Sequence, residues 1–236
     1  MNRSVHLGDD LFPPFSGFPR EGLGFLRKLK RNNNRQWFKR HRQVYEETVR
    51  FPMQCLIATL AQRMAESAPE IDFNPKKSIF RIYRDTRFSK SKIPYKTNIA
   101  ASFTFGGRKG PTEAPGLYVG IEPGEIFVGG GLYMPTGPQL KQIRASMATN
   151  PVPFLEVVEA PRFRRVFGGI EGEQLQRSPL GYSPDHTMID HLRHKQFYVG
   201  RVLEDTACLR RTFADTVVRT FSDCMPLVRW LARATG

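Results

Sequence analysis

The stretch that decides the fold is Leu117-Tyr118-Val119-Gly120-Ile121, then Glu122-Pro123-Gly124-Glu125, then Ile126-Phe127-Val128. Two apolar, β-branched and aromatic runs flank a Pro-Gly pair, and Pro followed by Gly suits the two central positions of a type II turn. The two runs are therefore predicted to pair as a β-hairpin.

Further strand patterns lie on both sides of this hairpin. Residues 79–84 have the composition of a strand, residues 99–105 alternate cleanly between faces, and residues 195–202 are compatible with a short last strand. Because no helical pattern separates the strands before residue 129, the sheet is predicted to be antiparallel. The Gly129-Gly130-Gly131 run that follows allows either a sharp bend or a close approach to another group.

Helical sequence patterns lie before and after the predicted strands. Apolar positions at three- and four-residue spacing predict helices after residue 22, from Arg35 and from Pro52 to Met64, and again after Pro135, with a long last helix from Leu209. The fold class is thus α+β: a central antiparallel sheet of about four to five strands flanked by N-terminal and C-terminal helices. Proline and glycine make residues 1–20 a predicted loose arm, and residues 21–236 a single α+β domain.

Positive charge is the unusual property of the composition. The 236 residues carry a formal net charge of +14, and two segments hold most of the excess. Residues 27–42 contain eight Lys or Arg and no acid, and residues 76–96 contain eight against one acid, Asp85. Clustered basic residues are typical of proteins with polyanionic partners, although a solvated basic surface gives the same count.

The remaining composition excludes other classes. Apolar residues make up 40%, no apolar run approaches the roughly 18 residues of a membrane span, and the N-terminus lacks the apolar core of a secretion signal. Cys55, Cys208 and Cys224 show no metal-binding or disulfide spacing. We therefore expect a cytoplasmic protein with no membrane association, no bound metal and no cofactor. The sequence leaves the oligomeric state open.

The most informative segment runs from Arg81 to Thr97. Arginine offers a planar fork of donors for phosphate, and lysine a mobile point charge. The candidate ligand-binding residues are Arg81, Arg84, Arg87, Lys92, Tyr95 and Lys96. Asp85 and Tyr95 are weak candidates for catalytic acid or base, and Asp85 is more naturally the partner of an arginine. The alternative is that the motif forms an internal structural network.

The order of residues in this segment places its charged side chains on two different faces of the predicted strand. In a strand, Arg81 and Tyr83 would point to one face, and Phe80, Ile82 and Arg84 to the other. We expect Arg84 to be partly buried and paired, and Arg87 and Lys96 to point outward toward a ligand. The open face of the sheet would carry Ser102, Tyr118 and Phe127, which suits either a stacking platform for bases or a covering helix.

The same segment carries a family resemblance. It resembles a family of conserved hypothetical proteins, a domain of unknown function, defined by an Arg-x-x-Arg-Asp-x-Arg-Phe motif followed by Lys-x-x-Tyr. Residues 32–38, 122–125, 129–131 and 185–186 also resemble landmarks of that family. Ser91 stands where the family usually places Asp or Asn, so this chain departs from the family pattern at that position. The resemblance implies a fold and a cytoplasmic setting, and brings no activity or catalytic residue.

A second polar cluster lies near residue 190. On a helix, His186, Asp190 and His194 would recur at i,i+4 spacing, which suits a metal, with His191 nearby. Asp185 makes a better helix cap after Pro184, so a structural role is favoured and no metal is predicted. No nucleotide-binding fingerprint or nucleophile motif is present in the sequence.

Three hypotheses follow for the function. The first is a protein that binds a phosphate-bearing ligand, with nucleic acid ahead of a free nucleotide. The second is an enzyme acting on an anionic or phosphorylated small molecule, and the third is a structural or interaction protein. A basic face that joins residues 27–42 to 76–96 would favour nucleic acid, a deep pocket at Arg84 and Asp85 an enzyme, and fully paired arginines a scaffold.

Overall fold

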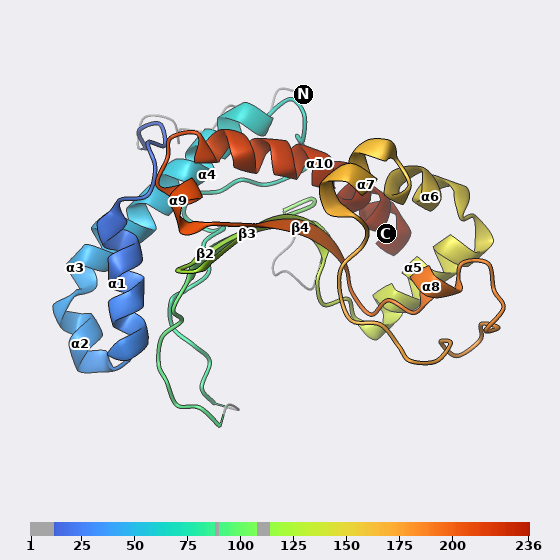
Figure 1. Ribbon diagram of the computed structural model, residues 1–236, viewed down its shortest axis with the longest axis horizontal. Helices are drawn as coiled ribbons and strands as arrows, with labels where there is room; N and C mark the ends of the chain where they lie inside the picture. The colour runs from blue at the N-terminus through green and yellow to red at the C-terminus, as the bar shows by residue number, and fades with distance from the viewer. Residues whose placement is uncertain (1–11, 88–89, 108–113) are drawn as a thin grey trace.

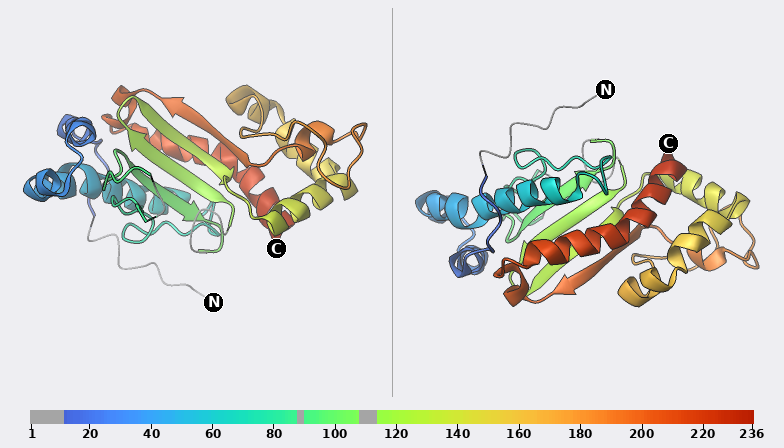
Figure 2. Two further views of the ribbon diagram at one scale, coloured as in Figure 1. Left: turned by 90° about the horizontal axis from the view of Figure 1, so that it is seen from below. Right: turned by 90° about the horizontal axis from the view of Figure 1, so that it is seen from above.

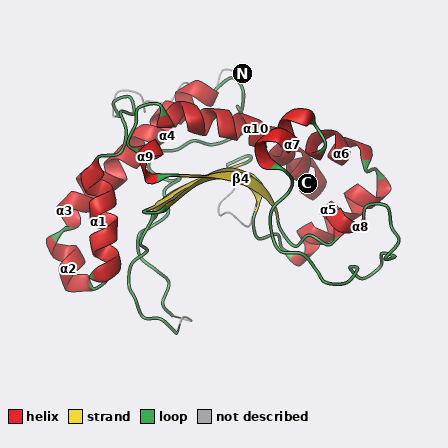
Figure 3. Ribbon diagram, viewed as in Figure 1, coloured by secondary structure: helices red, strands yellow, loops and turns green. Residues whose placement is uncertain are grey.

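The architecture is an arched sheet with helices above it and at both ends (Figures 1 and 3). The computed structural model describes residues 12–87, 90–107 and 114–236. Four antiparallel strands pair in chain order: β1 (Ile99–Thr104), β2 (Gly116–Glu122), β3 (Glu125–Leu132) and β4 (Phe197–Leu203). The α+β class and the antiparallel sheet are confirmed.

The hairpin predicted at residues 117–128 is present. Glu122 pairs with Glu125 and Val119 with Val128, so Pro123 and Gly124 are the two central turn residues. Gly124 has a φ of 97°, which the third position of a type II turn requires. The turn fixes the register of β2 and β3 and thereby the face on which each side chain lies.

The N-terminal helices are α1 (Arg20–Arg31), α2 (Arg35–Arg40), α3 (Arg42–Tyr45), the π-helical turn η1 (Glu46–Arg50) and α4 (Phe51–Met64). Asn34 caps α2, because its side-chain oxygen accepts a hydrogen bond from the Trp37 amide at 2.9 Å. The helix predicted from Arg35 breaks at His41 and then runs on through η1 into α4.

The C-terminal half contributes α5 (Gly137–Thr149), α6 (Val152–Val158), α7 (Pro161–Phe167), α8 (Ile189–Leu192), α9 (Asp205–Cys208) and α10 (Phe213–Thr235). Seen from above, α4 and α10 lie over the sheet, whereas from below no helix lies in front of the strands (Figure 2). The sheet therefore has one face covered by helices and one concave face without them.

Three segments differ from the sequence prediction. Residues 79–84 form no regular strand, because residues 78–80 bridge to β1 and the chain then turns away to pair with residues 94–96. The last helix begins at Phe213, not at Leu209. Residues 1–11 lie outside the described residues, but the rest of the expected loose arm is packed, with Phe15 and Phe18 buried against the core.

Both edges of the sheet carry further pairing. At β1, the Phe80 amide donates to the Ala100 carbonyl at 2.9 Å and the Ser102 amide donates to the Ser78 carbonyl at 3.1 Å. At β4, the Glu171 amide donates to the Tyr198 carbonyl at 2.8 Å. The Glu171 side chain accepts from the Gly200 amide at 3.2 Å. Irregular segments thus occupy part of each edge.

The core lies between the sheet and α4 with α10. Alternate strand residues such as Phe103, Val119 and Val128 are fully buried on that side. At Gly130 the sheet and α10 come especially close: an added Cβ would lie 2.8 Å from Leu117 Cδ2 and 3.0 Å from Cys224 Cβ. Close packing, not a bend, therefore explains a glycine at this position. No helix among the described residues has the length and apolar composition of a membrane span.

This packing yields a stability prediction. Gly130→Ala should lower the free energy of unfolding by about 1–3 kcal/mol, because the new methyl group overpacks the contact between β3 and α10. Gly24→Ala, in α1 with no atom within 4 Å of the added Cβ, should instead raise it by about 0.5–1 kcal/mol. Urea denaturation of both variants measures the two changes. Equal stability of Gly130→Ala and the parent protein would contradict the proposed contact.

Candidate functional site

The arginine-rich segment from Arg81 to Thr97, called the motif loop here, has two mutually paired arms, residues 82–84 and 94–96. The Arg84 amide donates to the Pro94 carbonyl at 2.9 Å and the Lys96 amide donates to the Ile82 carbonyl at 2.8 Å. The Asn33 side chain then binds both backbone groups of Tyr95, accepting from its amide and donating to its carbonyl at 3.0 Å each. Asn33 therefore fixes the motif loop to the turn between α1 and α2.

This clamp brings cations from two segments to one basic pocket, defined here by Lys30, Arg84 and Lys96. The pocket has a volume of about 570 Å³, and its other lining residues include Asn33, Tyr95, Thr97, Asn98, Phe80, Tyr118 and Glu122. Lys30 comes from α1, whereas Arg84 and Lys96 come from opposite arms of the motif loop. The two basic windows of the sequence thus meet in space.

The three cations differ in their surroundings. The Arg84 guanidinium is exposed and has no ion-pair or hydrogen-bond partner among the described residues. Burial, with a smaller contribution from Arg81, lowers the pKa of Lys96, whose ammonium lies 5.0 Å from the centre of the Phe80 ring. Lys30 Nζ lies 3.8 Å from a Glu122 oxygen that already accepts the Thr97 hydroxyl. Arg84 is the cation most open to a ligand.

Arg81 lies on the other side of the motif loop, as the strand pattern predicted. It lines a neighbouring pocket of about 250 Å³ together with Lys76, Arg42, Arg50 and Glu46. Glu46 is paired with Arg50 at 2.9 Å and with Arg42 at 3.7 Å. Lys76 and Arg81 have no carboxylate partner among the described residues, which leaves the pocket with an excess of cations. The basic surface therefore continues past the motif loop.

Other candidate residues have different roles from those expected. Arg87 binds the Asp85 carboxylate with both Nε and Nη2, at 3.0 and 2.7 Å. This bond holds the pKa of Asp85 far below its ordinary value. Lys92 donates to the Thr86 carbonyl at 3.0 Å. None of these three lines the basic pocket, and the expected roles are reversed: Arg87 is paired with a carboxylate, and Arg84 is not.

Tyr95 lines the basic pocket but is buried, with its ring stacked on Phe38 at 4.2 Å. Burial and the neighbouring Tyr83 raise its pKa, which disfavours the phenolate that a base would need. Sequence reasoning did not select Lys30 or Asn33 as site residues. Their signals were present: Lys30 lies in the first basic window and Asn33 in the Asn32–Asn34 run.

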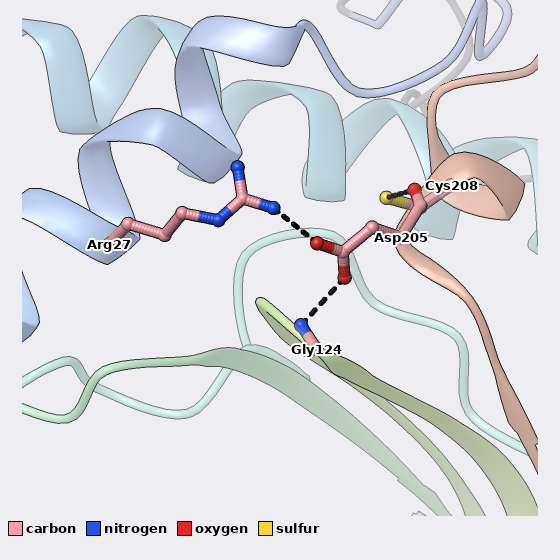
Figure 4. A network of polar contacts seen from close by, with 4 residues as sticks. All are labelled: Arg27, Gly124, Asp205 and Cys208. Carbon is pink, nitrogen blue, oxygen red and sulfur yellow. Dashed lines mark hydrogen bonds and ion pairs between the residues drawn. The ribbon is translucent and has the colours of Figure 1, made fainter.

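The position of α1 depends on a polar network shown in Figure 4. The Asp205 carboxylate accepts hydrogen bonds from Arg27 and, at 2.7 Å, from the Gly124 amide. The Cys208 thiol donates to the Asp205 carbonyl. Arg27 precedes Lys30 by one helical turn, so this network holds α1 beside the β2–β3 turn with Lys30 at the pocket.

A second hollow lies on the concave face of the sheet and is called the aromatic cleft here. Its volume is about 510 Å³, and it shares Phe80 and Tyr118 with the basic pocket. Its rings and carboxylates are Phe80, Tyr118, Phe127, Tyr133, Tyr198, Glu125 and Glu171. The prediction that Tyr118 and Phe127 lie together away from the core is confirmed, with ring centres 6.1 Å apart in this cleft. No helix lies in front of the strands on this face of the sheet (Figure 2). Arg81 and Tyr83 do not line this cleft.

The histidine cluster has structural partners. His186 Nδ1 accepts from the Met188 amide at 3.0 Å, His191 packs edge-on against Phe154, and buried His194 contacts the Gln174 amide at 2.9 Å. Asp185 does not cap a helix as predicted, because α8 begins only at Ile189. Within the described part of the chain, no three His, Cys, Asp or Glu side chains gather in a way that would hold a metal ion.

His194 gives a pH prediction. Burial, with a smaller contribution from His191, lowers its pKa from 6.5 to about 4. The fold accommodates the neutral ring, so its contribution to stability is complete above about pH 6.5 and is lost as the pH falls toward 4. We expect the free energy of unfolding to fall by up to about 3 kcal/mol over that range. His194→Gln, which does not titrate, should lack this component in urea titrations at each pH; an identical pH dependence in both proteins would contradict it.

Comparison with known proteins gives a family and nothing narrower. No curated protein and no solved structure matches the chain. The model of the family described as "Conserved hypothetical protein (DUF2461)" matches residues 21–230, which include the motif loop, the sheet and most of α10. The chain therefore belongs to the DUF2461 family of conserved hypothetical proteins.

Proposed function

We propose that the protein binds nucleic acid through its phosphate backbone, at the surface where the two basic segments meet. The supporting observation is the convergence of Lys30 from α1 with Arg84 and Lys96 from the motif loop on one pocket. The neighbouring pocket is lined by Lys76 from the second segment and by Arg42 from the first, whose Nε lies 3.7 Å from a Glu46 oxygen. A run of phosphates along this surface would meet cations from both.

The chemistry of each cation fits this role. Arg84 is exposed and can offer its planar fork to two phosphate oxygens, whereas Lys96 is a partly desolvated point charge. A charged hydrogen bond contributes about 1.5–3 kcal/mol when it is shielded from water, and less on an open surface. Binding would therefore depend on several contacts together and weaken with salt.

The acid/base candidates favour binding over catalysis. Asp85 is held by Arg87 outside the basic pocket, and Tyr95 is buried with a raised pKa. A free nucleotide is the second candidate ligand, because a volume of about 570 Å³ lies within the usual range for small-molecule sites. Nucleic acid and a free nucleotide can be distinguished by testing whether affinity increases with the length of the oligonucleotide.

The first test is fluorescence anisotropy of labelled single-stranded DNA, RNA and duplex DNA across a salt series. We expect log K to fall linearly with log salt concentration, and Arg84→Gln and Lys96→Gln each to reduce the slope by about 0.7–0.9, the contribution of one phosphate contact. Lys141→Gln, which removes an exposed charge from α5 at the other end of the molecule (Figure 1), is the matched control.

Three results would count against the proposal. The absence of binding at low salt would exclude it. An equal effect of Lys141→Gln and Arg84→Gln would assign the binding to net charge and not to the pocket. Competition by a mononucleotide as strong as that by a long oligonucleotide would assign the pocket to a free nucleotide instead.

A further inference from the structure

The aromatic cleft has a chemistry opposite to that of the basic pocket beside it. Among the residues that the structure describes, no Lys, Arg or His lines the cleft, whereas two carboxylates do, Glu125 and Glu171. This is a local excess of negative charge on a chain with a net charge of +14. The cleft therefore suits a different ligand from the phosphate groups proposed for its neighbour.

The aromatic rings form a connected row across the concave face. The ring centres of Tyr118 and Phe127 lie 6.1 Å apart, those of Phe127 and Tyr198 6.3 Å, and those of Tyr198 and Tyr133 5.4 Å. Glycine makes this row possible at Gly200, where an added Cβ would lie 2.2 Å from Phe127 Cζ. The Phe127 ring thus rests directly on the backbone of β4.

The two carboxylates lie at this row of rings and have no cationic partner among the described residues. Glu171 Oε1 accepts the Gly200 amide at 3.2 Å, which fixes the side chain at the cleft. Burial raises the pKa values of Tyr118 and Tyr198, with smaller contributions from Glu125 at Tyr118 and from Glu171 at Tyr198. Ring faces are themselves negative, so rings and carboxylates add to the same potential.

The molecule already places one cation on this set of rings. The Lys96 ammonium lies 5.0 Å from the centre of the Phe80 ring, at the border between the cleft and the basic pocket. This distance falls within the usual limit of about 6 Å for a cation–π contact. The remaining rings, from Tyr118 to Tyr133, have no such cation among the described residues.

We propose that the aromatic cleft is a binding site for an organic ammonium ion, held by the faces of Tyr118, Phe127, Tyr133 and Tyr198 and by the charges of Glu125 and Glu171. Aromatic rings bind quaternary and methylated ammonium groups in this way. These groups donate few or no hydrogen bonds, and their positive charge is attracted to ring faces. An anionic ligand would be repelled by both carboxylates. A nucleobase could stack on the rings, but it is uncharged and would gain no ionic attraction from the two carboxylates.

The experiment compares choline with its neutral isostere 3,3-dimethylbutan-1-ol, by calorimetry and ligand-observed NMR on the full chain. We expect choline to bind and the isostere to bind much more weakly. Tyr133→Leu, at the exposed rim, should weaken choline binding roughly 2- to 30-fold, the equivalent of one cation–π contact. Glu125→Gln and Glu171→Gln, which keep the side-chain shapes, should each weaken it, whereas Glu156→Gln on α6 should not.

The outcomes separate this inference from the proposed nucleic-acid binding. Arg84→Gln should reduce oligonucleotide binding and leave choline binding unchanged, because Arg84 lines only the basic pocket. Equal binding of choline and the neutral isostere would overturn the inference, since the cleft would then be merely apolar. Binding of adenosine or guanosine without choline would also overturn it and assign the cleft to nucleobases. Circular dichroism and melting of each variant exclude loss of the fold as the cause.

Discussion

Burial of one face of the antiparallel sheet against α4 and α10 is the constraint on which the rest of the structure depends. Side chains of a strand alternate between faces, so covering one side decides the position of every residue on the other. The contact is tight enough at Gly130 to exclude a methyl group. Both candidate sites then lie on the concave side, where the remaining half of the strand residues must be.

The two hollows differ in charge because different elements build them. The basic pocket depends on helix α1 and the motif loop, which Asn33 and Asp205 hold in place through backbone hydrogen bonds and an ion pair. The aromatic cleft depends on the strands themselves and on residue 171 at the sheet edge. Phe80 and Tyr118 line both hollows and form the border between them.

Local sequence patterns predicted the sheet well, whereas contacts between distant segments could not be predicted from them. Alternation and the Pro-Gly turn located the hairpin and the open face carrying Tyr118 and Phe127, because both signals lie within a few residues. The predicted roles of Arg84 and Arg87 are reversed in the structure. Asp85 pairs with Arg87 because of the geometry of the loop, which the spacing of these residues in the sequence does not reveal. Lys30 lies at the site because of long-range contacts of its neighbours, Asn33 with Tyr95 across 62 positions of the chain and Arg27 with Asp205. Residues 82–84 do not continue along β1 for the same reason: they pair with residues 94–96.

The pairing at both sheet edges bears on how the protein behaves at high concentration. An uncovered edge strand offers free amide and carbonyl groups to a second molecule, and such edges are frequent starting points for intermolecular strand addition and fibril growth. Here residues 78–80 occupy β1, and Glu171 occupies β4 with both its backbone and its side chain. These short irregular segments leave fewer groups for a neighbour to pair with. The concave face is therefore left uncovered by helices while part of each sheet edge is already paired.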